Sequence, residues 1–121
     1  MTSEEQQDEL LIRATEDWVH PGDVFDVARY AGFEEEDAYL EQAIYLTRRL
    51  IVDAFVVAGD VTGEGFRPWL LPPEDAAHKI AEQWRADPDS APSSYDVWLC
   101  ATPAGLARGE RALADDRPSP D

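Results

Sequence analysis

Residues 35–58 carry the pattern that most restricts how this chain can fold, because a long amphipathic stretch runs without a break into an apolar one. Over residues 35–53, apolar side chains recur at the three- and four-residue spacing of one helix face. Residues 55–58 are continuously apolar, which is typical of a buried strand. A helix and the strand that follows it directly must therefore share one core. The inward stripe of the helix consists of Leu40, Ala43, Ile44, Thr47, Leu50 and Ile51.

Helical spacing and end signals predict four further helices. Ser3 and Gln6 fit a capping box at the start of the first. Pro21 suits the first turn of the second. Thr102 followed by Pro103 suits an N-cap and the first helical position of the last. The four helices are expected near residues 4–17, 22–31, 74–86 and 103–113.

Two strands are expected near 55–58 and 96–101, paired in one small sheet, and Trp18 with Val19 could form one more short strand. A Gly59-Asp60 turn is expected to close the strand at 55–58. These elements predict an α+β fold that is mostly helical. The predicted organisation is a single domain over residues 1–114, followed by a disordered tail at 115–121.

The charge balance limits the classes of partner. Twenty-six acidic residues face ten basic ones, giving a formal net charge of -16, and asparagine is absent. Two explanations remain open. The acidity is either background, from a GC-rich genome or a high-salt cytoplasm, or it selects a basic partner. A hydrophobic content of 44% excludes the composition of a disordered chain.

The residues that most often carry chemistry are isolated in this sequence. His20 and His78 have no partners at metal-ligand spacing, and Cys100 alternates within an apolar strand as a buried, inert thiol would. No phosphate-binding loop or nucleophile motif is present. We therefore expect no enzymatic activity, no catalytic residues, no metal and no cofactor. The longest apolar run is too short to cross a bilayer and the N-terminus is acidic, so a cytoplasmic location is expected.

The order of elements resembles that of the winged helix-turn-helix superfamily. The stretch "VWLCATPAGLARGERAL" is similar to the end of many bacterial winged-helix regulators, in which the second wing strand leads through a Thr-Pro pair into a helix. "LTRRLIVDAFVVAGD" is similar to the place where a recognition helix enters the first wing strand. The resemblance covers about residues 8–113. It implies a winged-helix fold whose third helix, over residues 35–53, occupies the recognition position.

Two features depart from the winged-helix pattern. The connection between the wing strands, residues 59–96, is long enough to include a whole helix, and the expected recognition face is not basic. The segment "GDV…GFRPW", from Gly59 to Trp69, also resembles one shared by a group of small acidic bacterial proteins. That second resemblance implies no activity.

The outer face of the third helix is the expected binding surface. Tyr45, Arg48 and Arg49 combine residue types that are common at the centres of protein interfaces. The acids before them either stabilise the helix start through its dipole or steer a basic partner. We expect a non-enzymatic interaction module and, more specifically, an inhibitor or immunity-type protein that binds a basic protein. The alternative is a DNA-binding regulator, and a homodimer is also possible. The candidate partner-binding residues are Glu34, Glu35, Glu36, Asp37, Glu41, Gln42, Tyr45, Arg48 and Arg49.

Overall fold

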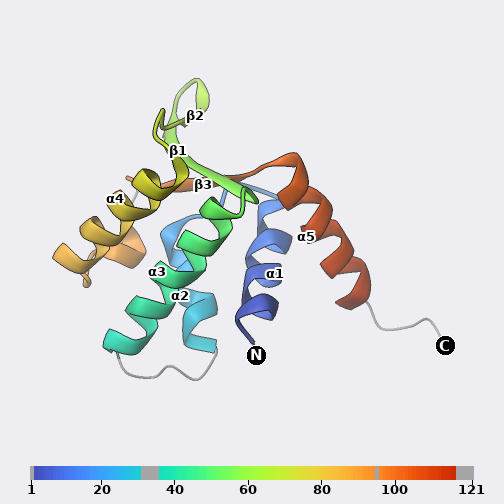
Figure 1. Ribbon diagram of the computed structural model, residues 1–121, viewed down its shortest axis with the longest axis horizontal. Helices are drawn as coiled ribbons and strands as arrows, with labels where there is room; N and C mark the ends of the chain where they lie inside the picture. Colours follow the sequence, from blue (N-terminus) through green and yellow to red (C-terminus); the bar gives the residue numbers. More distant parts are fainter. Residues whose placement is uncertain (1, 31–35, 95, 117–121) are drawn as a thin grey trace.

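The computed structural model describes residues 2–30, 36–94 and 96–116, which form an α+β protein with five helices and one three-stranded antiparallel sheet. The helices extend to one side of the sheet, and the tip of the β1–β2 hairpin points away from them (Figure 1). The elements in chain order are α1 (Ser3–Ala14), α2 (Pro21–Tyr30), α3 (Glu36–Val52), β1 (Val56–Thr62), β2 (Gly65–Pro68), α4 (Pro73–Ala86), the short 3-10 helix η1 (Ala91–Ser93), β3 (Trp98–Ala101) and α5 (Pro103–Asp116).

The first helix is capped one residue earlier than the sequence predicts. The Thr2 hydroxyl accepts a hydrogen bond from the Glu5 N–H, and the Glu5 carboxylate accepts one from the Thr2 N–H, both at 3.1 Å. The predicted Ser3–Gln6 box is therefore wrong. Gln6 does not cap the helix because the residue is only 1% exposed, its side-chain oxygen accepts from Gln42 and its amide donates to the Val27 carbonyl. The helix also ends at Ala14, earlier than expected.

The sheet confirms the predicted pairing of the two strands. In the antiparallel β1–β3 pair, Val56 lies opposite Ala101 and Gly59 opposite Trp98. Val19 adds the expected short extension through an isolated bridge to Leu99. Because β2 pairs with the other edge of β1, the strand order is β2-β1-β3.

The Gly59-Asp60 turn is wrong, since β1 continues through both residues to Thr62. The reversal lies at residues 63–64, and Gly65 follows it with a φ of 109°. Gly59 instead lets β2 approach closely, because a Cβ there would lie 2.3 Å from the Arg67 carbonyl oxygen. The glycine therefore serves strand packing rather than chain reversal.

The two helices that follow β1 in the chain, α4 and α5, pack against helices that precede it. The connection 59–96 contains α4, as predicted, and α4 lies along α3 while α5 lies along α1 (Figure 1). Phe25 of α2 and Trp84 of α4 meet in the core with ring centroids 5.1 Å apart. The last helix begins as predicted, with Thr102 accepting from the Gly105 N–H. It runs to Asp116, so the first two residues assigned to the tail are helical.

Candidate functional site

The helical pattern of α3 is confirmed at its inner face. All six residues of the predicted stripe are buried, and the sequence missed Leu46, which widens the buried arc. Leucine at that position is itself an apolar signal, but it lies between the two faces on a helical projection. On the outer face Tyr45 remains 44% exposed. The outer face of α3 is defined by Glu41, Gln42, Tyr45, Arg48 and Arg49.

One edge of this face is bordered by α4. Arg85 of α4 donates two hydrogen bonds to the Glu41 carboxylate, at 2.8 and 3.0 Å. Arg48 donates to Glu74 at 3.0 Å. The hydrogen bonds from Arg85 lower the pKa of Glu41, and those same bonds raise the pKa of Arg85. Two charged side chains of the outer face thus hold a neighbouring helix.

The other edge is bordered by α1. The Gln42 amide donates to the Gln6 side-chain oxygen at 2.6 Å, and Arg49 pairs with Asp53 at 2.8 Å. Gln42 is thereby tied to the core, whereas Arg49 keeps a side chain that is 43% exposed. Exposed pairs of this kind contribute about 0–1 kcal/mol, so Arg48 and Arg49 can exchange their partners at low cost.

The acidic start of α3 belongs only partly to the described chain. The backbone of Glu36 and Asp37 begins the helix. Glu34 and Glu35 lie outside the described residues. The role of these four acids as a cap or as the rim of an interface stays a prediction.

A polar cleft of about 470 Å³ opens beside Tyr45, between α1, α3 and α5. Arg108 spans it, pairing with Asp8 at 2.7 Å and lying 4.8 Å from the centre of the Phe55 ring. Arg49 lines the same cleft. Sequence reasoning missed this site because its residues come from helices about 100 positions apart, and no local motif relates them.

The two histidines and the cysteine make contacts within the fold. His20 Nδ1 accepts from the Gly22 N–H at 3.0 Å, and its ring centroid lies 5.2 Å from that of Trp98. His78 is exposed and lies 3.1 Å from Glu82. Cys100 is half-buried rather than fully buried. Burial raises the pKa of its thiol, which disfavours the reactive thiolate.

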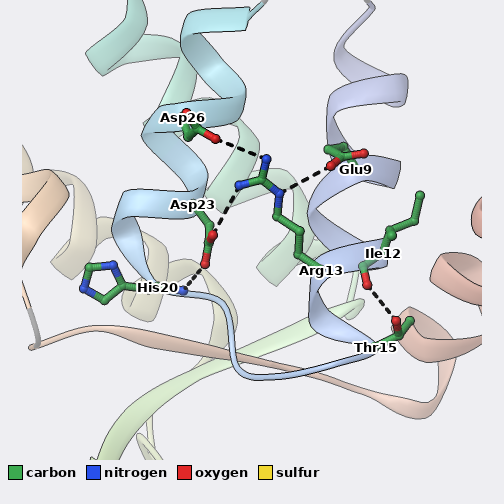
Figure 2. Close-up of polar contacts among 7 residues, drawn as sticks. All are labelled: Glu9, Ile12, Arg13, Thr15, His20, Asp23 and Asp26. Atoms are coloured by element: carbon green, nitrogen blue, oxygen red, sulfur yellow. Dashed lines mark hydrogen bonds and ion pairs between the residues drawn. The ribbon is translucent and has the colours of Figure 1, made fainter.

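Carboxylates do cluster around Arg13, where α1 and α2 meet. Its guanidinium nitrogens lie 3.2 to 3.3 Å from oxygens of Glu9, Asp23 and Asp26, and Asp23 also accepts from the His20 N–H (Figure 2). Burial lowers the pKa of Arg13, but the hydrogen bonds to Asp26 and Glu9 more than offset it, so that pKa is raised. An arginine fills the position that a cation would take, which makes this a structural cluster.

Nowhere in residues 2–30, 36–94 and 96–116 do three His, Cys, Asp or Glu side chains converge in a metal-binding arrangement. Over the same residues, no helix is both long and apolar enough to span a membrane. Comparisons with protein-family models, with curated proteins and with solved structures found no match. The chemistry of the described surface is therefore the basis for any functional proposal.

Proposed function

We propose that this protein is a non-enzymatic, acidic interaction module of winged-helix architecture that binds a basic protein, most sharply as an inhibitor or immunity-type protein. The observation that carries the proposal is the distribution of positive charge. Six of the nine basic residues that the structure describes form ion pairs with acids of the same chain. They are Arg13, Arg48, Arg49, Arg67, Arg85 and Arg108.

This pairing leaves the acids in excess. A surface dominated by carboxylates attracts a basic partner over distances comparable to the Debye length, about 8 Å at physiological salt, and accelerates its association. Tyr45 then supplies an exposed aromatic group of the kind that anchors protein interfaces. The outer face of α3 supplies this aromatic group, and acids of neighbouring segments, such as Asp53 and Glu74, border it.

The winged-helix assignment is supported by the order and pairing of the elements. The Val19 bridge, α2, α3 and the antiparallel β1–β3 pair follow one another as that architecture requires. In this assignment α3 takes the recognition position. The helix α4, within the connection of the two wing strands, is then an addition that flanks it.

DNA binding is the second candidate, favoured by the exposed guanidinium groups of Arg48 and Arg49 on the recognition-position helix. Duplex affinity depends largely on basic side chains that displace condensed counterions from phosphates. The pairs of these arginines with Glu74 and Asp53 are weak, but they place a carboxylate beside each guanidinium group, where it would repel phosphate, and α4 borders the helix. The protein-binding proposal therefore agrees better with the geometry.

The first test requires a partner, obtained by co-purification and identified by mass spectrometry. Tyr45→Ala is expected to weaken its binding by about 2 kcal/mol or more, mainly through faster dissociation, while barely changing the stability of the free protein. Glu35→Gln with Glu36→Gln is expected to slow association several-fold, with a smaller effect at high salt. Glu110→Gln, an exposed acid on α5, is the matched control. Kinetics unchanged by all of these variants would reject the outer face of α3.

The second test separates the two candidates directly. A selection from random DNA duplexes at about 150 mM salt is expected to return no reproducible motif. A motif bound with nanomolar affinity, and lost on Arg48→Ala and Arg49→Ala, would establish the DNA-binding candidate instead.

A further inference from the structure

The connection between β2 and α4 presents apolar side chains to solvent. Leu70 and Leu71 of this connection are 96% and 43% exposed, and Val57 of β1, which lines the adjoining groove with Leu71, is 40% exposed. Exposed leucines leave unused the favourable free energy that their burial would provide. A contiguous apolar patch on a soluble domain commonly marks an interaction site. This connection is separate from the outer face of α3 that carries the proposed function.

Trp69, the first residue of the connection, is anchored on the sheet. The Trp69 N–H donates to the Ala58 carbonyl at 3.0 Å, and the Trp69 indole donates to Asp60 at 3.1 Å. The Lys79 ammonium lies 4.0 Å from the centre of the same ring. Because Trp69 is fixed on the sheet, the neighbouring Leu70 projects from a defined position.

Prolines on both sides add to this order. Pro68 precedes Trp69, and Pro72 follows Leu71. Each proline fixes its own φ, and Pro72 also favours an extended backbone at Leu71. A surface that is already ordered loses little conformational entropy when a partner binds, so more of the contact energy appears as affinity.

A small apolar groove is lined in part by Trp69 and Leu71, the residues on either side of Leu70 in the chain. Its volume is about 130 Å³. Pockets for small molecules usually measure about 300–1,000 Å³, so this groove is too small for such a ligand. It suits a single apolar side chain inserted by a partner. Its lining includes Ile51, Val56, Ala58, Trp69, Leu71 and Ala76.

The net charge of the whole chain selects the kind of partner. Near the groove, Asp60 accepts a hydrogen bond from the Trp69 indole, and Glu74 and Asp75 lie in the first turn of α4. Lys79 lies over the Trp69 ring and Arg48 pairs with Glu74, so two of these three acids are offset locally. A second copy of the chain would carry the same net charge of -16 and be repelled, whereas a basic segment would be attracted.

We propose that Leu70, Leu71 and the adjoining groove dock a linear segment of a partner protein, in which one or two large apolar residues are flanked by lysine or arginine. This inference rests on the proposed function for the basic character of the partner. It adds a second contact surface, with a different chemistry from that of Tyr45.

The test uses a displayed library of random 12-residue peptides, selected against the immobilised full chain. Enriched peptides are expected to be basic and to contain a large apolar residue. A selected peptide, labelled and titrated by fluorescence polarisation, is expected to lose at least about tenfold in affinity on Leu70→Ser or Leu71→Ser. Leu106→Ser changes a leucine of α5 that is 38% exposed, and it is the matched control expected to bind normally. Thermal melting verifies that each variant is folded.

The outcomes separate this inference from the proposed function. Peptides that bind Leu70→Ser as tightly as the parent, but lose affinity on Tyr45→Ala, would overturn the docking groove and leave the outer face of α3 standing. Enrichment of acidic or uncharged peptides, or of none, would overturn the groove as a site for basic segments. Sedimentation that showed a dimer abolished by Leu70→Ser would assign the patch to a second copy and also overturn it. Loss of peptide binding only on the leucine variants supports the groove without bearing on Tyr45.

Discussion

Ala54, the second residue after α3, adopts a left-handed backbone conformation with a φ of 64°. Its N–H bonds to the Ile51 carbonyl, and the Phe55 N–H bonds to the Leu50 carbonyl. These are the two hydrogen bonds of a Schellman motif, in which glycine is the usual left-handed residue. The Thr102 hydroxyl also donates to the Ala54 carbonyl at 2.6 Å, so the start of α5 holds this helix end in place.

Ala54→Gly is therefore expected to stabilise the protein by about 0.5–1 kcal/mol. The left-handed conformation costs an L-residue about 1–2 kcal/mol, part of which glycine loses again through its more flexible unfolded state. Ala107→Gly makes the same change at an exposed position inside α5 and is expected to destabilise by about 1 kcal/mol. Urea unfolding measures both free energies. Equal destabilisation by the two changes would mean that Ala54 is not strained.

Arg13 is the second residue that we expect to matter for stability, since its guanidinium group lies between three acids contributed by α1 and α2 (Figure 2). Its side chain is 29% exposed, which makes its charge less screened than that of a typical surface residue. Without it, Glu9, Asp23 and Asp26 would face one another unneutralised.

Arg13→Ala is expected to lower the free energy of unfolding by about 1–2 kcal/mol, with a larger loss at low salt. Arg67→Ala removes an ion pair whose partners are 69% and 81% exposed, and is expected to cost almost nothing. Chemical unfolding at two ionic strengths measures the difference. A loss for Arg13→Ala that is insensitive to salt would point to lost packing rather than to acid repulsion.

Among the elements, the contact of α3 with α4 defines the candidate site. Apolar residues such as Ile80 and Trp84 bury the inner face of α4, while Arg85 and Glu74 reach across to Glu41 and Arg48. The arrangement couples the stability of α4 to the charge state of an acid on the outer face of α3. Acidification therefore has a local consequence there.

The lowered pKa of Glu41 determines the direction in which stability changes with pH. The carboxylate contributes stability above its unfolded pKa, near 4.5, and that contribution is lost as the pH falls through the lower folded pKa. Glu41→Gln is expected to remove part of the difference in stability between pH 7 and about pH 3, by no more than about 0.5 kcal/mol because the pair is exposed. Glu110→Gln is the control. Unfolding curves at both pH values that are equal for parent and variant would contradict the coupling.

At the scale of the whole molecule, the excess of acidic residues lowers the stability of the folded state. Most of its basic residues are already paired, so the remaining acids repel one another at any pH near 7. Folding brings these charges closer together than they are in the extended chain. The same excess is what would attract a basic partner.

Raising sodium chloride from about 20 to about 500 mM is therefore expected to increase the free energy of unfolding by about 1 kcal/mol or more, since screening relieves the repulsion. A variant with Glu16→Gln, Glu82→Gln and Glu110→Gln carries three fewer negative charges and is expected to gain less. Thermal or urea unfolding across the salt series measures both. A decrease in stability with salt would mean that the ion pairs outweigh the repulsion.

Local periodicity was sufficient to predict the helices and the exposed position of Tyr45, because residues three or four apart on a helix face the same way whatever surrounds them. The confirmed β1–β3 pairing joins segments far apart in the sequence, which periodicity within either segment does not specify. Only the tertiary structure decided how wide the buried arc of α3 is, which of two overlapping capping boxes forms, and where β1 turns. Leu46 and Gln6 are buried by helices distant in sequence, and Gly59 is required by the close approach of β2. The cleft spanned by Arg108 and the groove beside Leu71 likewise exist only where separate elements meet. Their residues are brought together by packing, which leaves no periodic trace in the chain.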